Sequence, residues 1–147
     1  MGGFKENKRP EVIYIYGSSA KDLYEENEPD TFRINLGTTL DLEGKWEMAL
    51  MDIDLPRLTT NYKPQYITLY SSVCTSSIIG AAQRPILYRF FKSDLRYTKA
   101  LNITTPRYVP LNTDSLPVID IYLLDDKGEK PSFQKGQTTC TLHLRKI

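Results

Sequence analysis

The residues that could do chemistry in this chain are few, and their spacing matches no known catalytic arrangement. His143 is the only histidine, whereas a cupin-type metal centre needs several. A Ser–His–acid triad would need a serine in a nucleophile elbow, and no serine has that context. No glycine-rich loop that could hold a phosphate is present. We therefore expect no enzymatic activity, no catalytic, cofactor-binding or metal-binding residues, and no cofactor.

Two groups of carboxylates are spaced closely enough to be considered as cation sites. Asp52 and Asp54 lie two residues apart, and Asp125, Asp126 and Glu129 surround a glycine. The first pair fits the solvated face of a strand better than a cation site. The second group lacks the spacing of an EF-hand loop and fits a polar hairpin turn. We expect both groups to be structural, and we expect His143 to point outward from the last strand.

Charge and cysteine usage narrow the choice of partner and compartment. The net charge is +1, and acidic and basic residues alternate without the basic stripe of a nucleic-acid-binding surface. No apolar run approaches the ~20 residues that span a bilayer, and none follows the charged N-terminus as in a secretory signal. We expect Cys74 and Cys140 to be free thiols in a reducing compartment.

The elements that would position these residues are short strands with period-two alternation or apolar runs, bounded by turn residues. The expected strands are Glu11–Tyr16, Thr31–Leu36, Trp46–Leu55, Gln65–Val73, Ile86–Phe91, Pro117–Leu124 and Gln137–Leu144, with a short one near Ala100–Ile103. The expected connections are Gly17–Asp30, Arg57–Pro64, Thr75–Pro85 and the rest of Lys92–Leu116.

This pattern predicts an all-β fold, an antiparallel two-sheet β-sandwich of seven or eight strands. Residues 1–10 are expected to be a flexible basic arm, and residues 11–147 a single domain. Residue pattern alone leaves a jelly roll and an immunoglobulin-like sandwich open. The Cys–Trp–Cys order of a true immunoglobulin domain is absent, because Trp46 precedes both cysteines.

The strand Trp46–Leu55 changes phase midway. Trp46 and Leu50 share one face, whereas Met51 and Ile53 take the other. Such a change predicts either a β-bulge or a strand that passes between two environments, leaving the core for a neighbour. We expect Trp46 to anchor the core.

The ten tyrosines are the clearest compositional feature. Those on expected strands are Tyr14, Tyr16, Tyr66, Tyr70, Tyr88 and Tyr122. Tyrosine suits strands and cores, and it is also enriched where proteins meet. A tyrosine opposite an apolar inner face, such as Tyr122 opposite Ile121, must contact solvent or a partner, which favours assembly.

Residues in both halves of the chain resemble the minor capsid (penton-type) protein of Polinton/Maverick elements and adintovirus-like viruses, whereas the middle, Ser71–Thr105, matches that family only loosely. In the N-terminal half the matching residues are Tyr24, Asn27, Phe32, Ile34, Leu36, Leu42, Gly44, Trp46, Glu47, Ala49, Leu50 and Pro56. In the C-terminal half they are Arg107–Leu111, Ile119, Ile121, Asp125, Asp126, Gly128, Phe133, Gly136, Thr141, Leu142, His143 and Arg145. The chain departs from the family pattern at Glu25, where proline is expected, and at Met48, where valine is expected.

The resemblance implies a single jelly roll over residues 11–147 and a structural role in the virion. It implies a homopentamer that forms the capsomer at the icosahedral vertices beside a separate major capsid protein. The basic arm would then contact the genome or a neighbouring subunit. The alternative is a β-sandwich binding module for a glycan or receptor, with Arg57–Pro64 and Lys92–Leu116 as its binding loops.

Overall fold

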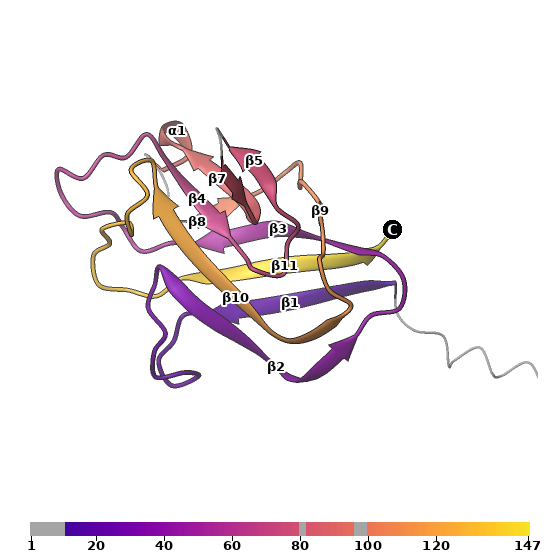
Figure 1. Ribbon diagram of the computed structural model, residues 1–147. Helices are drawn as coiled ribbons and strands as arrows, with labels where there is room; N and C mark the ends of the chain where they lie inside the picture. Colours follow the sequence, from indigo (N-terminus) through magenta and orange to yellow (C-terminus); the bar gives the residue numbers. More distant parts are fainter. Residues whose placement is uncertain (1–10, 80–81, 96–99) are drawn as a thin grey trace, which may run out of the picture.

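In a computed structural model that describes residues 11–79, 82–95 and 100–147, the chain forms two antiparallel sheets packed face to face (Figure 1). The described residues contain eleven strands and one short helix. The strands are β1 (Val12–Ser18), β2 (Thr31–Asp41), β3 (Trp46–Asp54), β4 (Tyr66–Tyr70), β5 (Ser77–Ile79), β6 (Ala82–Arg84), β7 (Ile86–Phe91), β8 (Ala100–Asn102), β9 (Val109–Pro110), β10 (Ser115–Asp125) and β11 (Thr139–Lys146). The helix is α1 (Lys92–Leu95).

The order of strands in the sheets is that of a single jelly roll. One sheet has the order β1-β11-β3-β8, with β9 also paired to β3, and the other has the order β2-β10-β4-β7. The first strand, β1, is therefore the neighbour of the last strand, β11, and β2 is the neighbour of β10. The chain thus passes back and forth between the two sheets. The expected two-sheet β-sandwich is confirmed. The topology further resolves the choice that residue pattern left open in favour of the jelly roll.

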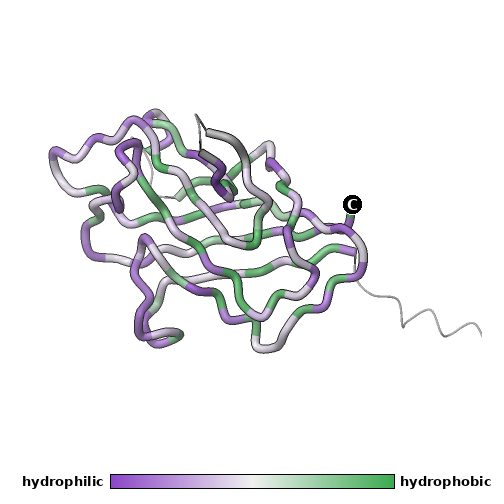
Figure 2. Tube along the Cα trace, viewed as in Figure 1, coloured by the Kyte–Doolittle hydropathy of each residue, from purple (hydrophilic) through white to green (hydrophobic). Residues whose placement is uncertain are grey.

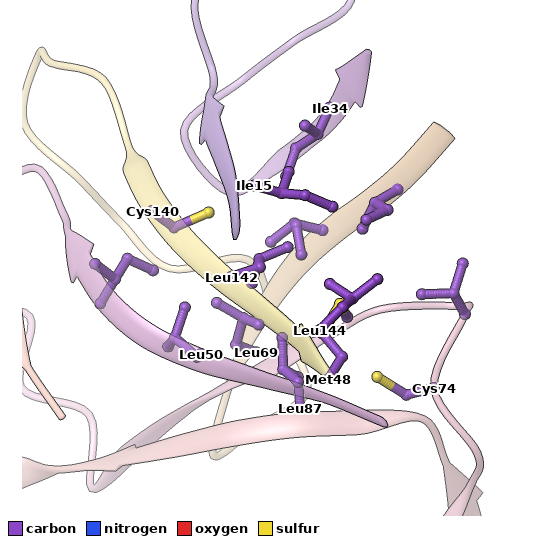
Figure 3. Close-up of a cluster of buried hydrophobic side chains, with 14 of the residues drawn as sticks. Ile15, Ile34, Met48, Leu50, Leu69, Cys74, Leu87, Cys140, Leu142 and Leu144 are labelled. Atoms are coloured by element: carbon purple, nitrogen blue, oxygen red, sulfur yellow. The ribbon is translucent and has the colours of Figure 1, made fainter. Parts of the chain in front are cut away.

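The two sheets enclose a continuous apolar core. Hydrophobic and hydrophilic residues alternate along the strands in Figure 2, as strands with one buried face require. On β10, Ile119, Ile121 and Leu123 are fully buried, and on β11 Leu142 and Leu144 are too. Figure 3 shows part of this core, including the last two side chains.

The turn before β3 fixes Trp46 as the core anchor that the sequence predicts. Gly44 has a φ of 85°, a left-handed conformation that glycine adopts without steric cost. The Trp46 side chain is 6% exposed, and its indole N–H donates to the Glu43 carbonyl at 2.9 Å. A buried indole is thereby satisfied as well as packed.

A β-bulge at Met51 explains the phase change in β3. Along the β3–β11 ladder, Thr141 pairs with Asp52 but Leu142 pairs with Leu50, so Met51 has no partner on β11. The extra residue returns Ile53 to the inner face, where it is 1% exposed. The bulge is therefore confirmed, and the alternative was wrong: the strand stays in the core after the phase change.

Two predictions about connections and one about the end of a strand were also wrong. The segment Thr75–Pro85 is not all loop, because β5 and β6 form a hairpin within it. The stretch Lys92–Leu116 contains α1 and β9 besides the expected short strand, which is confirmed as β8. The second strand runs to Asp41 rather than ending at Leu36, because Gly37, at φ 76°, lets the backbone turn and resume pairing with β10.

The sheet orders give the sandwich two distinct flanks. The edge strands β1 and β2 lie against each other on one side, here called the β1 flank. The other edges, β7 in one sheet and β8 and β9 in the other, form the opposite side, here called the β7 flank. Figure 1 shows β1 and β2 along one side of the molecule and β7 and β8 along the other. Unpaired edges of this kind are where a sheet can meet another chain.

Candidate functional site

His143 lies in an aromatic cluster on the outer face of its sheet. Its ring stacks on Tyr14 with centroids 4.5 Å apart, and its Nδ1 lies 2.7 Å from the Tyr108 hydroxyl. The Arg145 guanidinium lies 3.4 Å above the centre of the Tyr108 ring and 3.3 Å from the Glu47 carboxylate. The predicted outward orientation is confirmed, yet His143 is only 9% exposed because the two tyrosines cover it.

The surroundings of His143 suit packing rather than catalysis. Burial, together with the nearby charge of Arg145, lowers the pKa of His143 below its ordinary value, so the ring is neutral at pH 7. Among its described neighbours no carboxylate hydrogen-bonds to the ring, as a triad would require. The histidine instead joins β1, β11 and the segment that carries Tyr108.

Of the two groups of carboxylates considered as cation sites, one makes hydrogen bonds within the chain and the other lies along a strand. Asp125 is 7% exposed, and its side chain accepts hydrogen bonds from the Lys127 and Glu129 N–H groups and from the Tyr62 hydroxyl. Burial would raise the pKa of Asp125, but these hydrogen bonds outweigh it and hold the pKa below the usual range. The predicted polar turn is confirmed, but it is not a hairpin turn, because β10 and the next strand, β11, lie in different sheets.

Asp52 and Asp54 stand two residues apart on the outer face of β3, each half-buried and opposite a threonine of β11. No group of three or more His, Cys, Asp or Glu side chains within residues 11–79, 82–95 and 100–147 is arranged to hold a metal ion.

Both cysteines are buried free thiols at separate places in the core (Figure 3), as predicted. Burial, with a smaller effect of a nearby aspartate, raises the pKa of Cys74 and of Cys140 to about 12. A thiol with so high a pKa is a poor nucleophile. The described helix is also far too short to cross a membrane.

A surface cleft of about 520 Å³ lies on the β7 flank. It lies between β7 and the segment Arg107–Pro110 and is lined by Tyr88, Arg89, Phe91, Asp94, Arg107, Tyr108 and Val109, among others. The Asp94 carboxylate accepts from the Phe91 N–H at 2.9 Å. Arg89 lies 4.0 Å above the Tyr66 ring and donates to Thr68. In the sequence, Arg107–Leu111 stands out as a motif and lies within the expected loop Lys92–Leu116, but no sequence pattern predicts that it forms a cleft with β7.

On the β1 flank, the tyrosines of β1 face solvent. Tyr14 is 55% and Tyr16 is 76% exposed. The Tyr14 ring faces solvent on one side only, because its other side stacks on His143. Tyr70 and Tyr122 stack on each other across two strands, with centroids 4.9 Å apart. The prediction that outward tyrosines meet solvent or a partner therefore holds most clearly for Tyr16.

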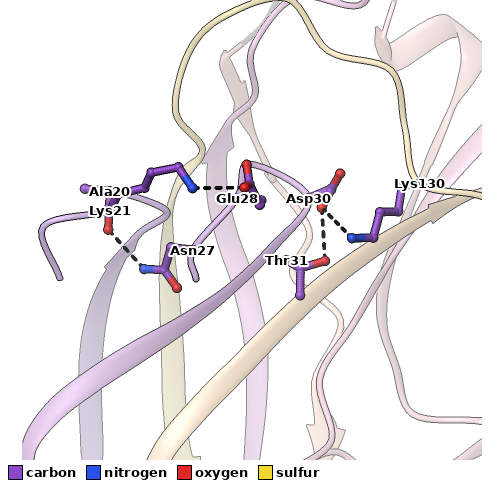
Figure 4. Close-up of polar contacts among 7 residues, drawn as sticks. All are labelled: Ala20, Lys21, Asn27, Glu28, Asp30, Thr31 and Lys130. Carbon is purple, nitrogen blue, oxygen red and sulfur yellow. Dashed lines mark hydrogen bonds and ion pairs between the residues drawn. The ribbon is translucent and has the colours of Figure 1, made fainter. Parts of the chain in front are cut away.

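The connection between β1 and β2 is held in one shape by its own polar contacts (Figure 4). Asn27 is 2% exposed; its amide nitrogen donates to the Ala20 carbonyl, and its oxygen accepts from the Arg33 N–H. Lys21 and Glu28 form an ion pair at 2.9 Å across the same connection. A buried amide with both ends satisfied fixes the backbone around it.

No protein-family model matches this chain, and no curated protein matches its sequence. A solved structure does match: the crystal structure of selenomethionine-labelled mavirus penton protein, with a TM-score of 0.58 and 9% sequence identity. The match covers 92% of this chain and 100% of that chain. The two proteins share one fold. At this identity the likeness concerns the fold alone, and it extends over nearly all of the chain.

Four of the residues that carry the family resemblance occupy structural positions here. Asn27 holds the β1–β2 connection, and Trp46 anchors the core. Gly128 has a φ of 77° in the turn after β10. Gly136 lies against Pro56, where an added Cβ would approach the proline ring at 3.2 Å. These four motif residues therefore lie in turns, in a connection or in the core, whereas Arg107 and Arg145 of the same motif are exposed.

Proposed function

We propose that this protein is a non-enzymatic minor capsid protein of the penton type. Its subunits would form the homopentameric capsomer at the icosahedral vertices of a Polinton/Maverick or adintovirus-like virion. The observation that carries the proposal is the single jelly roll shared with mavirus penton protein over 92% of this chain. The family motifs in both halves of the chain support it independently.

The proposed function depends on how the sides of neighbouring subunits fit together. A five-membered ring needs heterologous contacts, in which one side of a subunit meets a different side of its neighbour. The sandwich offers two such sides, because its sheet edges are divided between the β1 flank and the β7 flank. Side-by-side packing in a ring would also cover edges that otherwise invite aggregation.

The proposed partners are four further copies of the chain and a major capsid protein encoded by the same genetic element. Residues 1–10, which lie outside the described part of the chain, carry the basic side chains of Lys5, Lys8 and Arg9. We propose that this arm contacts the genome or a neighbouring subunit. The compartment that follows from the proposal is the virion.

Light scattering coupled to size-exclusion chromatography tests this function, with the chain alone at high concentration and then mixed with the major capsid protein. The expected result is a pentamer, or a monomer that enters a complex when the major capsid protein is added. A chain that stays strictly monomeric and also fails to join the major capsid protein contradicts the proposal.

A further inference from the structure

Exposed large apolar side chains gather on the β1 flank. Among the described residues, those that are large, apolar and more than half exposed are Val12, Tyr14, Tyr16, Leu23, Phe91 and Ile147. Three of these six belong to β1 and a fourth to the connection that follows it. Exposed apolar side chains that lie together on a monomer often mark an interaction site, and aromatic residues are enriched at interfaces.

The same connection is strongly acidic. Residues 17–30 contain five carboxylates and one lysine. Lys21 pairs with Glu28, whereas Asp22, Glu25 and Glu26 are exposed and form no ion pair with a described basic residue. Leu23, 55% exposed, therefore projects from a negatively charged surface.

This acidic surface has a fixed shape. The Asn27 amide bridges the backbone of Ala20 and Arg33, and Lys130 lies 3.9 Å from Asp30 at the far end of the connection (Figure 4). The Thr138 hydroxyl adds a hydrogen bond to the Pro29 carbonyl at 2.7 Å. A surface that is ordered before binding loses less conformational entropy on association.

The cleft on the β7 flank has the complementary character. Arg107 is exposed and forms no ion pair with a described carboxylate, and Arg89 lines the same cleft. Asp94 also lines the cleft; its carboxylate accepts from a backbone N–H but keeps its charge, so with the two arginines the lining side chains carry a net charge of +1. Phe91, 56% exposed, and Val109 add apolar surface. The cleft is thus basic and partly apolar, open to an acidic segment with an apolar tip.

We infer that the β1–β2 connection of one subunit docks into the β7-flank cleft of the next, with Glu25 and Glu26 facing Arg107 and Leu23 entering the cleft. The occupant is a second copy because the two surfaces match in charge and lie on opposite flanks, so one chain cannot bring them together within itself. Contacts between unlike flanks are heterologous and can close a ring. This inference rests on the proposed function and names the contact that would build the pentamer.

Charge reversal at exposed positions tests the contact without disturbing the core. The variants are Glu25→Lys with Glu26→Lys, Arg107→Glu, and all three together in one chain. Glu129→Lys is the matched control, because it reverses another exposed carboxylate, which lies in the turn after β10. Sedimentation velocity over a concentration series measures the concentration at which half of the subunits are assembled, and thermal melting verifies folding.

Either reversal alone should raise that concentration by about tenfold or more, because like charges then face each other across the contact. The combined variant should recover most of the loss, since each subunit again meets an opposite charge on its neighbour. The control should match the wild type. A wild-type pentamer that neither reversal weakens overturns this inference and leaves the proposed function standing. A wild-type chain that neither self-associates nor joins the major capsid protein overturns both.

Discussion

Deleting Met51 should leave the jelly roll intact, although it shortens a central strand by one residue. In the structure Met51 is the residue of β3 without a partner on β11. When it is removed, the remaining residues from Trp46 to Leu55 alternate inward and outward without interruption. The ladder should then close with Leu50 and Asp52 in their present pairings.

The expected loss of stability follows from the contacts that Met51 makes. Its carbonyl accepts a hydrogen bond from the Ile103 N–H at 2.9 Å, and its side chain is half-buried. Loss of that hydrogen bond costs about 1 kcal/mol, and we expect a total loss of about 1–2 kcal/mol. If the register shifted instead, Ile53 and Leu55, now 1% and 4% exposed, would turn outward at about 1.5–3 kcal/mol each.

Urea denaturation followed by the fluorescence of Trp46, the only tryptophan, measures the free energy of unfolding. Deletion of Ile121 is the control, because β10 has no bulge at that position and either Ile119 or Leu123 must change face. That deletion should cost about 4 kcal/mol or more. If deletion of Met51 proves as damaging as deletion of Ile121, the reasoning about register is refuted.

Three further predictions concern single side chains. Asn27→Ala should lower the free energy of unfolding by about 1–3 kcal/mol in denaturant titration, because two backbone groups lose their partner, whereas Glu25→Ala should have no effect. Thiol reagents should label Cys74 and Cys140 only after unfolding, since both are buried; rapid labelling of native protein would contradict this. Stability should fall as pH drops below about 6.5, because the folded state lowers the pKa of His143 and the unfolded state binds its proton first. Stability should fall less steeply with pH in His143→Gln, and an unchanged slope would contradict the role of His143 in this pH dependence.

The sequence predicted the sheets well because burial on one face leaves a period-two signal. The expected strands from Trp46 to Leu55 and from Pro117 to Leu124 match β3 and β10 to within a few residues. The signal failed where pairing is short or irregular. The strands β5, β6 and β9 have two or three residues each, too few for a period to show. The extension of β2 depends on Gly37, which has a left-handed conformation; in the sequence, a glycine at this position predicts a turn.

The candidate surfaces were less predictable from the sequence. The exposed tyrosines of β1 follow from alternation, because Ile15 between them points inward. The cleft does not follow, since it brings β7 together with Arg107–Pro110, two segments whose proximity depends on the packing of one sheet on the other. The burial of His143 depends on Tyr108, which reaches it from an irregular segment. Contacts of this kind have no local signature in the sequence.

Electron cryomicroscopy of particles made by co-expressing this chain with the major capsid protein of the same genetic element would show directly where the chain lies in the shell. We predict one jelly roll of this chain in each of five positions around every five-fold vertex, with the β1 flank of one copy against the β7 flank of the next. Vertices occupied by another protein, or this chain bound elsewhere on the shell or absent from it, would contradict the proposed function.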